Sequence, residues 1–257
     1  MASSTVEVAF LPFSPGTRLE DSTTIAGAIW RDTLAGISQA SGFQGVYWGR
    51  QTENPDTIQL LVRMCYPSID FPGRSSVLLL LLSWPNSYMC PDWASKTAHE
   101  EFAQTPLYAA VSNPVTAILA ATPHMYHVGL GPLPIFPPLS GDVSPVTELA
   151  TFHFAADATE KEFDAFSTEV NGFVETVKKA DGHTATVSGW VIEELELPSR
   201  VERGKAFVAA FGWESMDAQG RFEKTKVFEE KMVGLRGLVK ELETHCVAFA
   251  VVQHYYS

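Results

Sequence analysis

The chain contains an internal repeat, because its first half matches its second half when it is shifted by 120 positions. Residues 93–129 align with residues 213–249 without a gap. A duplicated unit constrains the fold more strongly than local propensity does, since both copies must reach the same structure. We therefore expect two copies of one supersecondary unit. Identical pairs in this alignment are Trp93 with Trp213, Ser95 with Ser215, Ala98 with Ala218, Phe102 with Phe222 and Thr105 with Thr225.

The second copy shows the order of elements most clearly. Thr159 and Glu162 have the spacing of a capping box, so a helix should begin there. Apolar residues then recur every three or four positions as far as Val177, which is typical of one helix face. This βαββαβ order is the ferredoxin-like pattern, an α+β fold. The predicted strands are 146–154, 184–197, 205–213 and 246–253, and the second predicted helix is 217–242.

The first copy repeats this order. We divide the chain into a first ferredoxin-like unit at 1–130, a linker at 131–145 and a second unit at 146–257. The linker is rich in proline, which donates no ladder hydrogen bond and favours an extended connector. The predicted strands of the first unit are 6–13, 45–51 and 124–130, and its predicted helices are 22–41 and 93–120.

Residues 63–92 have no counterpart in the second copy. Joining Val62 almost directly to Trp93 would reproduce the junction at 211–213. We consider two explanations: a genuine insertion, or a retained intron, since the codons for this segment can spell splice-like signals. A rival register instead makes 77–84 the third strand of the first unit.

Composition excludes several classes of function. The net charge of −12 argues against a nucleic-acid surface and against anionic membranes. No apolar run approaches the ~20 residues of a membrane helix, and no secretory signal is evident, so we expect a cytoplasmic protein. The three cysteines lack zinc-ligand spacing, and no nucleotide-binding motif is present. We therefore expect neither a cofactor nor a metal, although the histidines leave a haem ligand open.

Two further motifs carry a family resemblance. WGRQTENPDT follows the first predicted helix, and W-x-S-x-x-A-x-x-x-F opens the second. With the tandem units, they resemble the dimeric α/β-barrel superfamily, and more narrowly the fungal tandem proteins related to antibiotic-biosynthesis monooxygenases. The resemblance spans nearly the whole chain except 63–92. It implies two sheets packed face to face as one pseudo-dimeric α/β barrel, with helices outside and a ligand cavity within. Such folds host many activities, so the fold alone does not give the function.

Strand alternation indicates which residues should face that cavity. Phe152 aligns with Phe10, and a repeated phenylalanine suits the helix-facing core. His153 and Thr151 should then face the cavity. A histidine in an apolar cavity can act as a base near neutral pH. The alternative is a histidine bonded to a backbone carbonyl at the rim.

The predicted strand 124–130 carries the most chemistry. His124 and Tyr126 share one face, and His127 lies on the other. The second copy has Cys246 and Val247 where the first has Tyr126 and His127, so the first copy alone should be equipped. We predict Tyr126, His127 and His153 as catalytic, with His124 and Thr151 contacting substrate. The alternative is that Tyr126 and His127 are packed or solvated.

Other candidates are weaker. Trp48 could stack on an aromatic substrate and Arg50 could hold its carboxylate or enolate. The competing interpretation, which we favour for Arg50, is an outward pair with Glu53 or Asp56. His99, which is replaced by Gln219 in the second copy, suggests a helix-surface or rim residue.

The sequence thus favours a cofactor-independent enzyme of secondary metabolism that acts by proton transfer on an apolar, polyketide-like small molecule. Its reaction would be that of a cyclase, a decarboxylase or other lyase, or a cofactor-free monooxygenase. Two alternatives stay open. One is a non-catalytic small-molecule-binding or stress-response barrel, and the other is a scaffold for oligomerisation, for which a homodimer is the simplest form.

Overall fold

The computed structural model describes residues 4–40, 43–64, 94–130, 145–199 and 201–252. Its first unit follows the predicted order of strands and helices. The third strand lies directly after the second, so the rival register with its third strand at 77–84 is wrong; residues 65–93 themselves lie outside the described ranges. The elements are β1 (Ser4–Pro12), α1 (Ile25–Ser38), β2 (Phe43–Arg50), β3 (Thr57–Met64), α2 (Ala94–Ala103), α3 (Pro106–Thr116) and β4 (His124–Leu130).

The second unit also follows the predicted order, with a short extra hairpin between its second and third long strands. In place of the last predicted strand, 246–253, there are two strands, and the first begins at Glu241, inside the predicted helix 217–242. The elements are β5 (Val146–His153), α4 (Glu160–Val177), β6 (His183–Trp190), β7 (Leu195–Glu196), β8 (Arg203–Gly204), β9 (Ala206–Trp213), α5 (Met216–Glu223), α6 (Lys226–Arg236), β10 (Glu241–Val247) and β11 (Ala250–Val252).

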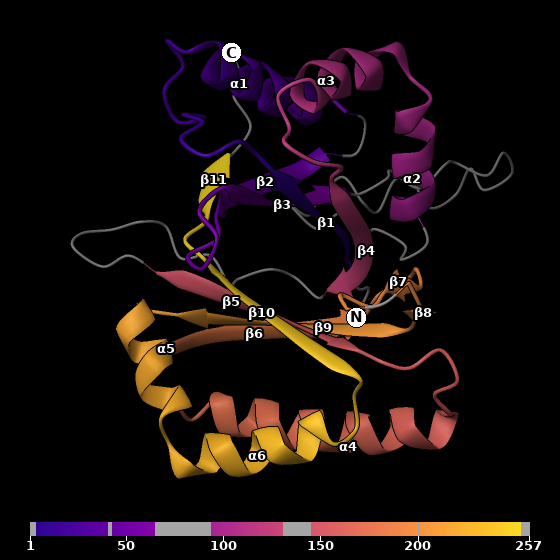
Figure 1. Ribbon diagram of the computed structural model, residues 1–257, viewed down its shortest axis with the longest axis vertical. Coiled ribbons are helices and arrows are strands. Elements are labelled where there is room, and N and C mark those ends of the chain that lie inside the picture. Colours follow the sequence, from indigo (N-terminus) through magenta and orange to yellow (C-terminus); the bar gives the residue numbers. More distant parts are fainter. Residues whose placement is uncertain (1–3, 41–42, 65–93, 131–144, 200, 253–257) are drawn as a thin grey trace, which may run out of the picture.

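The two main sheets have the same strand order. The first runs β2-β3-β1-β4 and the second β6-β9-β5-β10, with every pair antiparallel. Strand β11 leaves the second unit and pairs with β2 at the edge of the first sheet (Figure 1). The C-terminal segment therefore ties the two units together.

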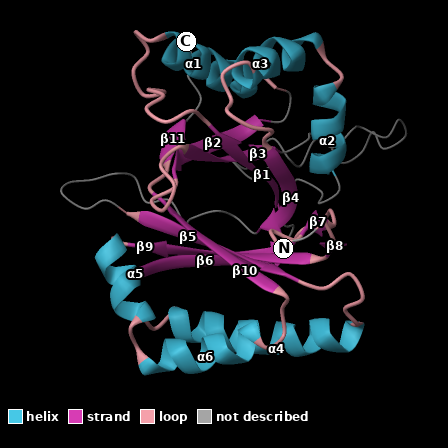
Figure 2. Cartoon of the chain, in the orientation of Figure 1, coloured by secondary structure: helices cyan, strands magenta, loops and turns pink. Residues whose placement is uncertain are grey.

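Helices form the outer layers. Helices α1 and α3 cover the outer face of the first sheet, and α4 and α6 cover the outer face of the second (Figure 2). The sheets pack against each other through a shared apolar core, where the family resemblance implied a ligand cavity. This inner core includes Val6, Val8, Leu61, Val128, Leu149, Val208, Ala210 and Val247.

Short contacts link the edges of the two sheets. At one edge, the Ile192 amide donates to the His127 carbonyl at 2.8 Å. At the other, the Thr52 amide donates to the Cys246 carbonyl at 2.8 Å. The segment after β6 is thereby held against β4.

Threonine caps set the helix boundaries. The predicted capping box is confirmed, since the Thr159 amide donates to the Glu162 carboxylate at 2.7 Å. Each of the long helices predicted at 93–120 and 217–242 is instead two helices, because Thr105 and Thr225 have extended backbones and cap α3 and α6. These two caps are a pair in the sequence repeat.

The strand register corrects the predicted alignment of the copies by one residue. Glu7 lies opposite Val62 and His127, whereas Glu148 lies opposite Phe211 and Cys246. Glu7 and Glu148 are therefore equivalent, as are His127 and Cys246.

This one-residue slip reverses the face of each side chain. Phe10 packs against the inner core and Phe152 against the helices, so their predicted equivalence is wrong. Tyr126 likewise faces inward and is not equivalent to Cys246, which shares the outer face of β10 with Thr244.

The structure describes no helix that is both long and apolar enough to cross a bilayer. The 131–144 part of the linker and the 65–92 part of the insertion lie outside the described ranges, so both interpretations of the insertion stay predictions.

Candidate active site

A pocket of about 160 Å³ lies between the outer face of the first sheet and helices α1, α2 and α3. A dry cavity of ~150 Å³ is known to hold one benzene ring, so this pocket has room for a single aromatic ring. Its walls are mainly apolar, with polar groups at one side. The apolar lining includes Ala9, Leu11, Trp30, Leu60, Val62, Phe102, Val111, Val115 and Leu119, and the polar lining includes Glu7, His99 and Tyr108.

His127 is the best-oriented titratable group beside this pocket. Its side chain is buried and points from β4 towards α2. Glu193 holds it at two points, with 2.8 Å between Glu193 Oε1 and His127 Nδ1 and 2.9 Å between Glu193 Oε2 and the His127 amide. A carboxylate accepts from Nδ1–H, so we assign the proton to Nδ1, which leaves Nε2 as the basic nitrogen.

Glu193 comes from the second unit, so both copies build the site. Burial alone would raise the pKa of Glu193, but the hydrogen bonds from the His127 ring and amide outweigh it and lower the pKa to about 2. The group is thus a carboxylate at neutral pH. It serves as the fixed acceptor that orients His127.

His99 extends this chain of polar groups into the pocket. Its Nδ1 lies 3.0 Å from His127 Nε2, and its Nε2 lies 3.4 Å from Glu7 Oε2. With hydrogen on Nδ1, His99 donates to His127 Nε2, and its own Nε2 faces Glu7 Oε2. Glu193, His127, His99 and Glu7 therefore form a continuous chain, in which His99 can pass its Nδ1 hydrogen to His127 while its Nε2 takes up another.

Glu7 and Tyr108 complete the polar side of the pocket. Glu7 is half-buried on β1, beside His127 on the next strand. Burial, and secondarily the charge of Glu7, raise the pKa of Tyr108. Tyr108 therefore stays neutral and can donate a hydrogen bond to a bound oxygen atom.

One cluster in the described ranges has the composition of a metal site. Donor atoms of Glu7, His99 and His127 all lie within 4.8 Å of one another. Two histidines and a carboxylate suit several divalent transition metals.

The second unit has a corresponding pocket of about 430 Å³ between its sheet and helices. Burial and the nearby charge of Glu223 raise the pKa of Glu148 in its wall to about 7. The Trp213 indole donates to the Glu148 carboxylate at 3.3 Å. Gln219, the sequence counterpart of His99, is buried and also hydrogen-bonds Glu148.

The other sequence-predicted residues lie elsewhere. His153 occupies the inner face of β5, as alternation predicts, with its Nε2 3.0 Å from Glu243 Oε2. Tyr126 OH lies 3.3 Å from Thr151 Oγ1 on the same inner side. Tyr126 therefore faces away from His127, as strand alternation predicts, so these two predicted catalytic side chains do not meet.

His124 is exposed on the Tyr126 face of β4, where its ring lies 5.8 Å from that of Tyr126. Four of the predicted site residues therefore lie between the sheets near Glu243: His124, Tyr126, Thr151 and His153. Of the predicted catalytic residues, only His127 lies beside the pocket beneath the helices.

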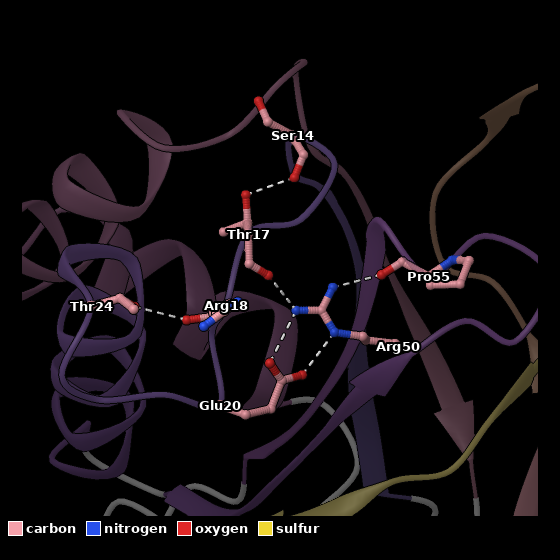
Figure 3. Close-up of polar contacts among 7 residues, drawn as sticks. All are labelled: Ser14, Thr17, Arg18, Glu20, Thr24, Arg50 and Pro55. Atoms are coloured by element: carbon pink, nitrogen blue, oxygen red, sulfur yellow. Dashed lines mark hydrogen bonds and ion pairs between the residues drawn. The ribbon is translucent and has the colours of Figure 1, made fainter.

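Arg50 makes hydrogen bonds that have a structural role. Its guanidinium donates to the Glu20 carboxylate at 2.7 Å and to the carbonyls of Pro55 and Thr17 at 2.6 and 2.7 Å (Figure 3). It therefore fixes the loop before α1, and its carboxylate partner is neither Glu53 nor Asp56. These contacts leave it outside the pocket.

Trp48 does not line the pocket, although it contacts the lining residue Trp30. Its ring packs edge-on against Trp30 with 5.3 Å between centroids, in the core between the sheet and α1. This contact places it in the packing of the unit.

Glu7 and Glu193 were not predicted from the sequence, and His99 was predicted only as a helix-surface or rim residue. His99 is partly buried beside His127, not on a helix surface. The replacement of His99 by Gln219 in the second copy was the sequence signal that could have marked it as a site residue. Glu7 is the one charged residue of β1 and lies between Val6 and Val8, which was a second signal. Glu193 had none, because two adjacent glutamates usually mark a solvated segment.

Comparisons with solved structures identify the fold. An anthrone oxidase-like protein matches with a TM-score of 0.60 and 10% identity, over 96% of this chain and 92% of that chain. A candidate monooxygenase from Fusobacterium nucleatum matches with a TM-score of 0.57 and 9% identity, over 97% and 94%. Another candidate monooxygenase, from Lactobacillus acidophilus, matches with a TM-score of 0.53 and 10% identity, over 97% of this chain and 95% of that chain.

The fold of this chain is therefore shared, over nearly its whole length, by proteins described as candidate monooxygenases. At these identities the likeness shows the fold alone. No protein-family profile and no curated sequence matches the chain.

Proposed function

We propose that this protein is a cofactor-independent enzyme that removes a proton from an oxygenated aromatic small molecule, most simply as a monooxygenase. The observation that carries the proposal is the Glu193–His127–His99 chain at the wall of an apolar pocket. A positioned base oriented by a buried carboxylate is the arrangement that general-base catalysis needs. We further propose that the two sheets act as one pseudo-dimeric α/β barrel that supports this pocket.

The reaction balances without an added reductant. His127, through His99, takes a proton from a phenol or from a methylene group next to a carbonyl, and the resulting anion donates electrons to O₂. For a methylene group, one oxygen atom enters the substrate as a ketone and the other leaves as water. The substrate supplies all four electrons, so O₂ is the only co-substrate. Tyr108 is placed to donate to the substrate oxygen.

Pocket size limits the substrate. A volume of about 160 Å³ accepts one ring, so a larger polyketide would project from the pocket. The apolar lining suits that ring, and the polar side formed by Glu7, His99 and Tyr108 would orient its oxygen atom. The descriptions of the structural neighbours as monooxygenases and as anthrone oxidase-like support this class of substrate.

The test uses 1-naphthol and anthrone as probes, each of which would place one ring in the pocket and project from its mouth. The purified full chain, treated with a chelator, should consume O₂ with either probe, and ¹⁸O₂ should label the product. His127→Gln, which keeps a donor for Glu193, should abolish consumption. Product formation under nitrogen would instead indicate a cyclase or lyase, and would overturn the monooxygenase form of the proposal.

A second candidate function is ligand binding without catalysis. It is favoured by the mainly apolar lining of the pocket. In that case 1-naphthol would quench tryptophan fluorescence through Trp30 and no probe would be turned over.

A further inference from the structure

We propose that Glu7, His99 and His127 bind one divalent transition-metal ion, for which Zn²⁺ and Co²⁺ are the probes. These residues come from β1, α2 and β4, so the fold brings together groups that are distant in sequence. Their donor atoms lie within 4.8 Å of one another in the described chain. Metal binding itself does not depend on the proposed reaction.

The distances are close to those of a metal site. Zinc–nitrogen bonds of ~2.0–2.1 Å in a tetrahedron place ligand atoms about 3.3 Å apart. His99 Nδ1 and His127 Nε2 are 3.0 Å apart, and His127 Nε2 is 3.9 Å from Glu7 Oε2. His99 Nε2, not Nδ1, is the ring nitrogen that faces Glu7 Oε2, at 3.4 Å. All the donor atoms lie within 4.8 Å of one another, so the Glu7 side chain must move closer to the two imidazoles to complete three protein ligands.

The outer contacts of His127 strengthen the assignment. A metal-binding histidine usually donates its second ring nitrogen to a carboxylate, which fixes the tautomer and raises the basicity of the ligand. Glu193 makes this contact with Nδ1 at 2.8 Å, and it leaves Nε2 directed at the cluster. Glu7 and Glu193 also supply two negative charges beside a divalent ion.

The position of the cluster indicates what the ion would meet. Glu7 and His99 both line the pocket, so a fourth coordination position would open into it. A ligand oxygen or water could occupy that position. The second unit provides an internal comparison, because Gln219 and Cys246 stand where the first has His99 and His127, and burial raises the pKa of the Cys246 thiol. We expect no ion there.

This site has a consequence for activity that rests on the proposed function. The ion would replace the hydrogen shared by His99 and His127, so metal binding and proton transfer exclude each other. Zn²⁺ should therefore inhibit an enzyme that is active without metal.

The experiment titrates the chelator-treated full chain with Co²⁺ and follows its visible absorption. One equivalent should bind with the strong bands of tetrahedral cobalt, and Zn²⁺ should displace it. Glu7→Gln and His99→Asn should each weaken binding at least ~10-fold, and Glu193→Gln should weaken it by ~10–100-fold. The matched control is His124→Asn, which removes an exposed histidine and should leave binding unchanged.

Absence of a tetrahedral spectrum, or equal affinity in Glu7→Gln and His99→Asn, would overturn the metal site. Loss of binding in His124→Asn would do the same, because it would place the ion on the surface. These readouts need no substrate. A chain that binds Co²⁺ but turns over no probe would contradict the proposed function alone, and an active chain without Co²⁺ binding would contradict this inference alone.

Discussion

Glu7 in the first unit and Glu148 in the second occupy equivalent strand positions beneath equivalent helices, yet their surroundings differ. Glu7 lies beside two histidines that reach a third group, Glu193, in the other unit. Glu148 lies beside the Gln219 amide, the Trp213 indole and the strand residue Cys246. None of these groups can act as a base at neutral pH.

The comparison shows how a duplicated fold can divide its tasks. The same backbone positions hold a proton-transfer chain in one copy and an isolated buried acid in the other. The second unit then contributes to the first pocket through Glu193. If this account is right, substitutions at equivalent positions should have unequal effects.

The largest difference is expected between His127→Gln and Cys246→Ala, at equivalent strand positions. Removing the base should lower turnover by ~10²–10⁴-fold. Removing the buried thiol should lower stability modestly and leave turnover unchanged, since burial raises its pKa and keeps it protonated. Initial rates of O₂ consumption and thermal midpoints on both variants check this. Equal losses of turnover would show that the second pocket is also catalytic.

The second prediction concerns pH and stability. The pKa of Glu148 is raised from 4.5 to about 7, so the folded state holds this proton more tightly than the unfolded state. The free energy of unfolding should therefore fall as pH rises from 4.5 to 7, by roughly 3 kcal/mol at ~1.4 kcal/mol per pKa unit. Glu148→Gln should remove this dependence in urea unfolding across that range.

Glu223→Gln is the control for that measurement. It removes the charge that contributes most after burial to the raised pKa, so the pH-dependent loss should move to lower pH. A stability profile of Glu148→Gln that follows the wild-type profile would show that another group causes the trend.

The smallest effect is expected at His153. Its ring lies on the inner side of β5, away from the pocket, so His153→Gln should keep wild-type turnover and cost roughly 1 kcal/mol of stability. Steady-state kinetics together with a thermal midpoint would test this. A large loss of turnover with normal stability would move the active site to the space between the sheets.

Sequence patterns predicted the fold better than the site. The repeat and the capping box at Thr159 give the element order, because they depend on local spacing. The facing of strand residues depends on register, and the copies differ by one position in the loops before β4 and β10. A separate one-position slip, between β1 and β5, placed Phe10 and Phe152 together, although they lie on opposite faces of their sheets.

The site was harder to predict for a related reason. His127 was identified from its strand, but its partners are brought to it by tertiary contacts. Glu193 follows the crossing of β6 to the edge of β4, and His99 comes from a helix that packs on that strand. The spacing of residues along the sequence does not predict such tertiary contacts.

The most direct test of the account is turnover by His99→Gln, because it gives the first pocket the amide that the second pocket already contains. The account predicts that O₂ consumption falls by at least ~10²-fold, while 1-naphthol still quenches tryptophan fluorescence. That result would show that the histidine chain separates a working pocket from a merely binding one. Wild-type O₂ consumption by this variant would contradict the central claim.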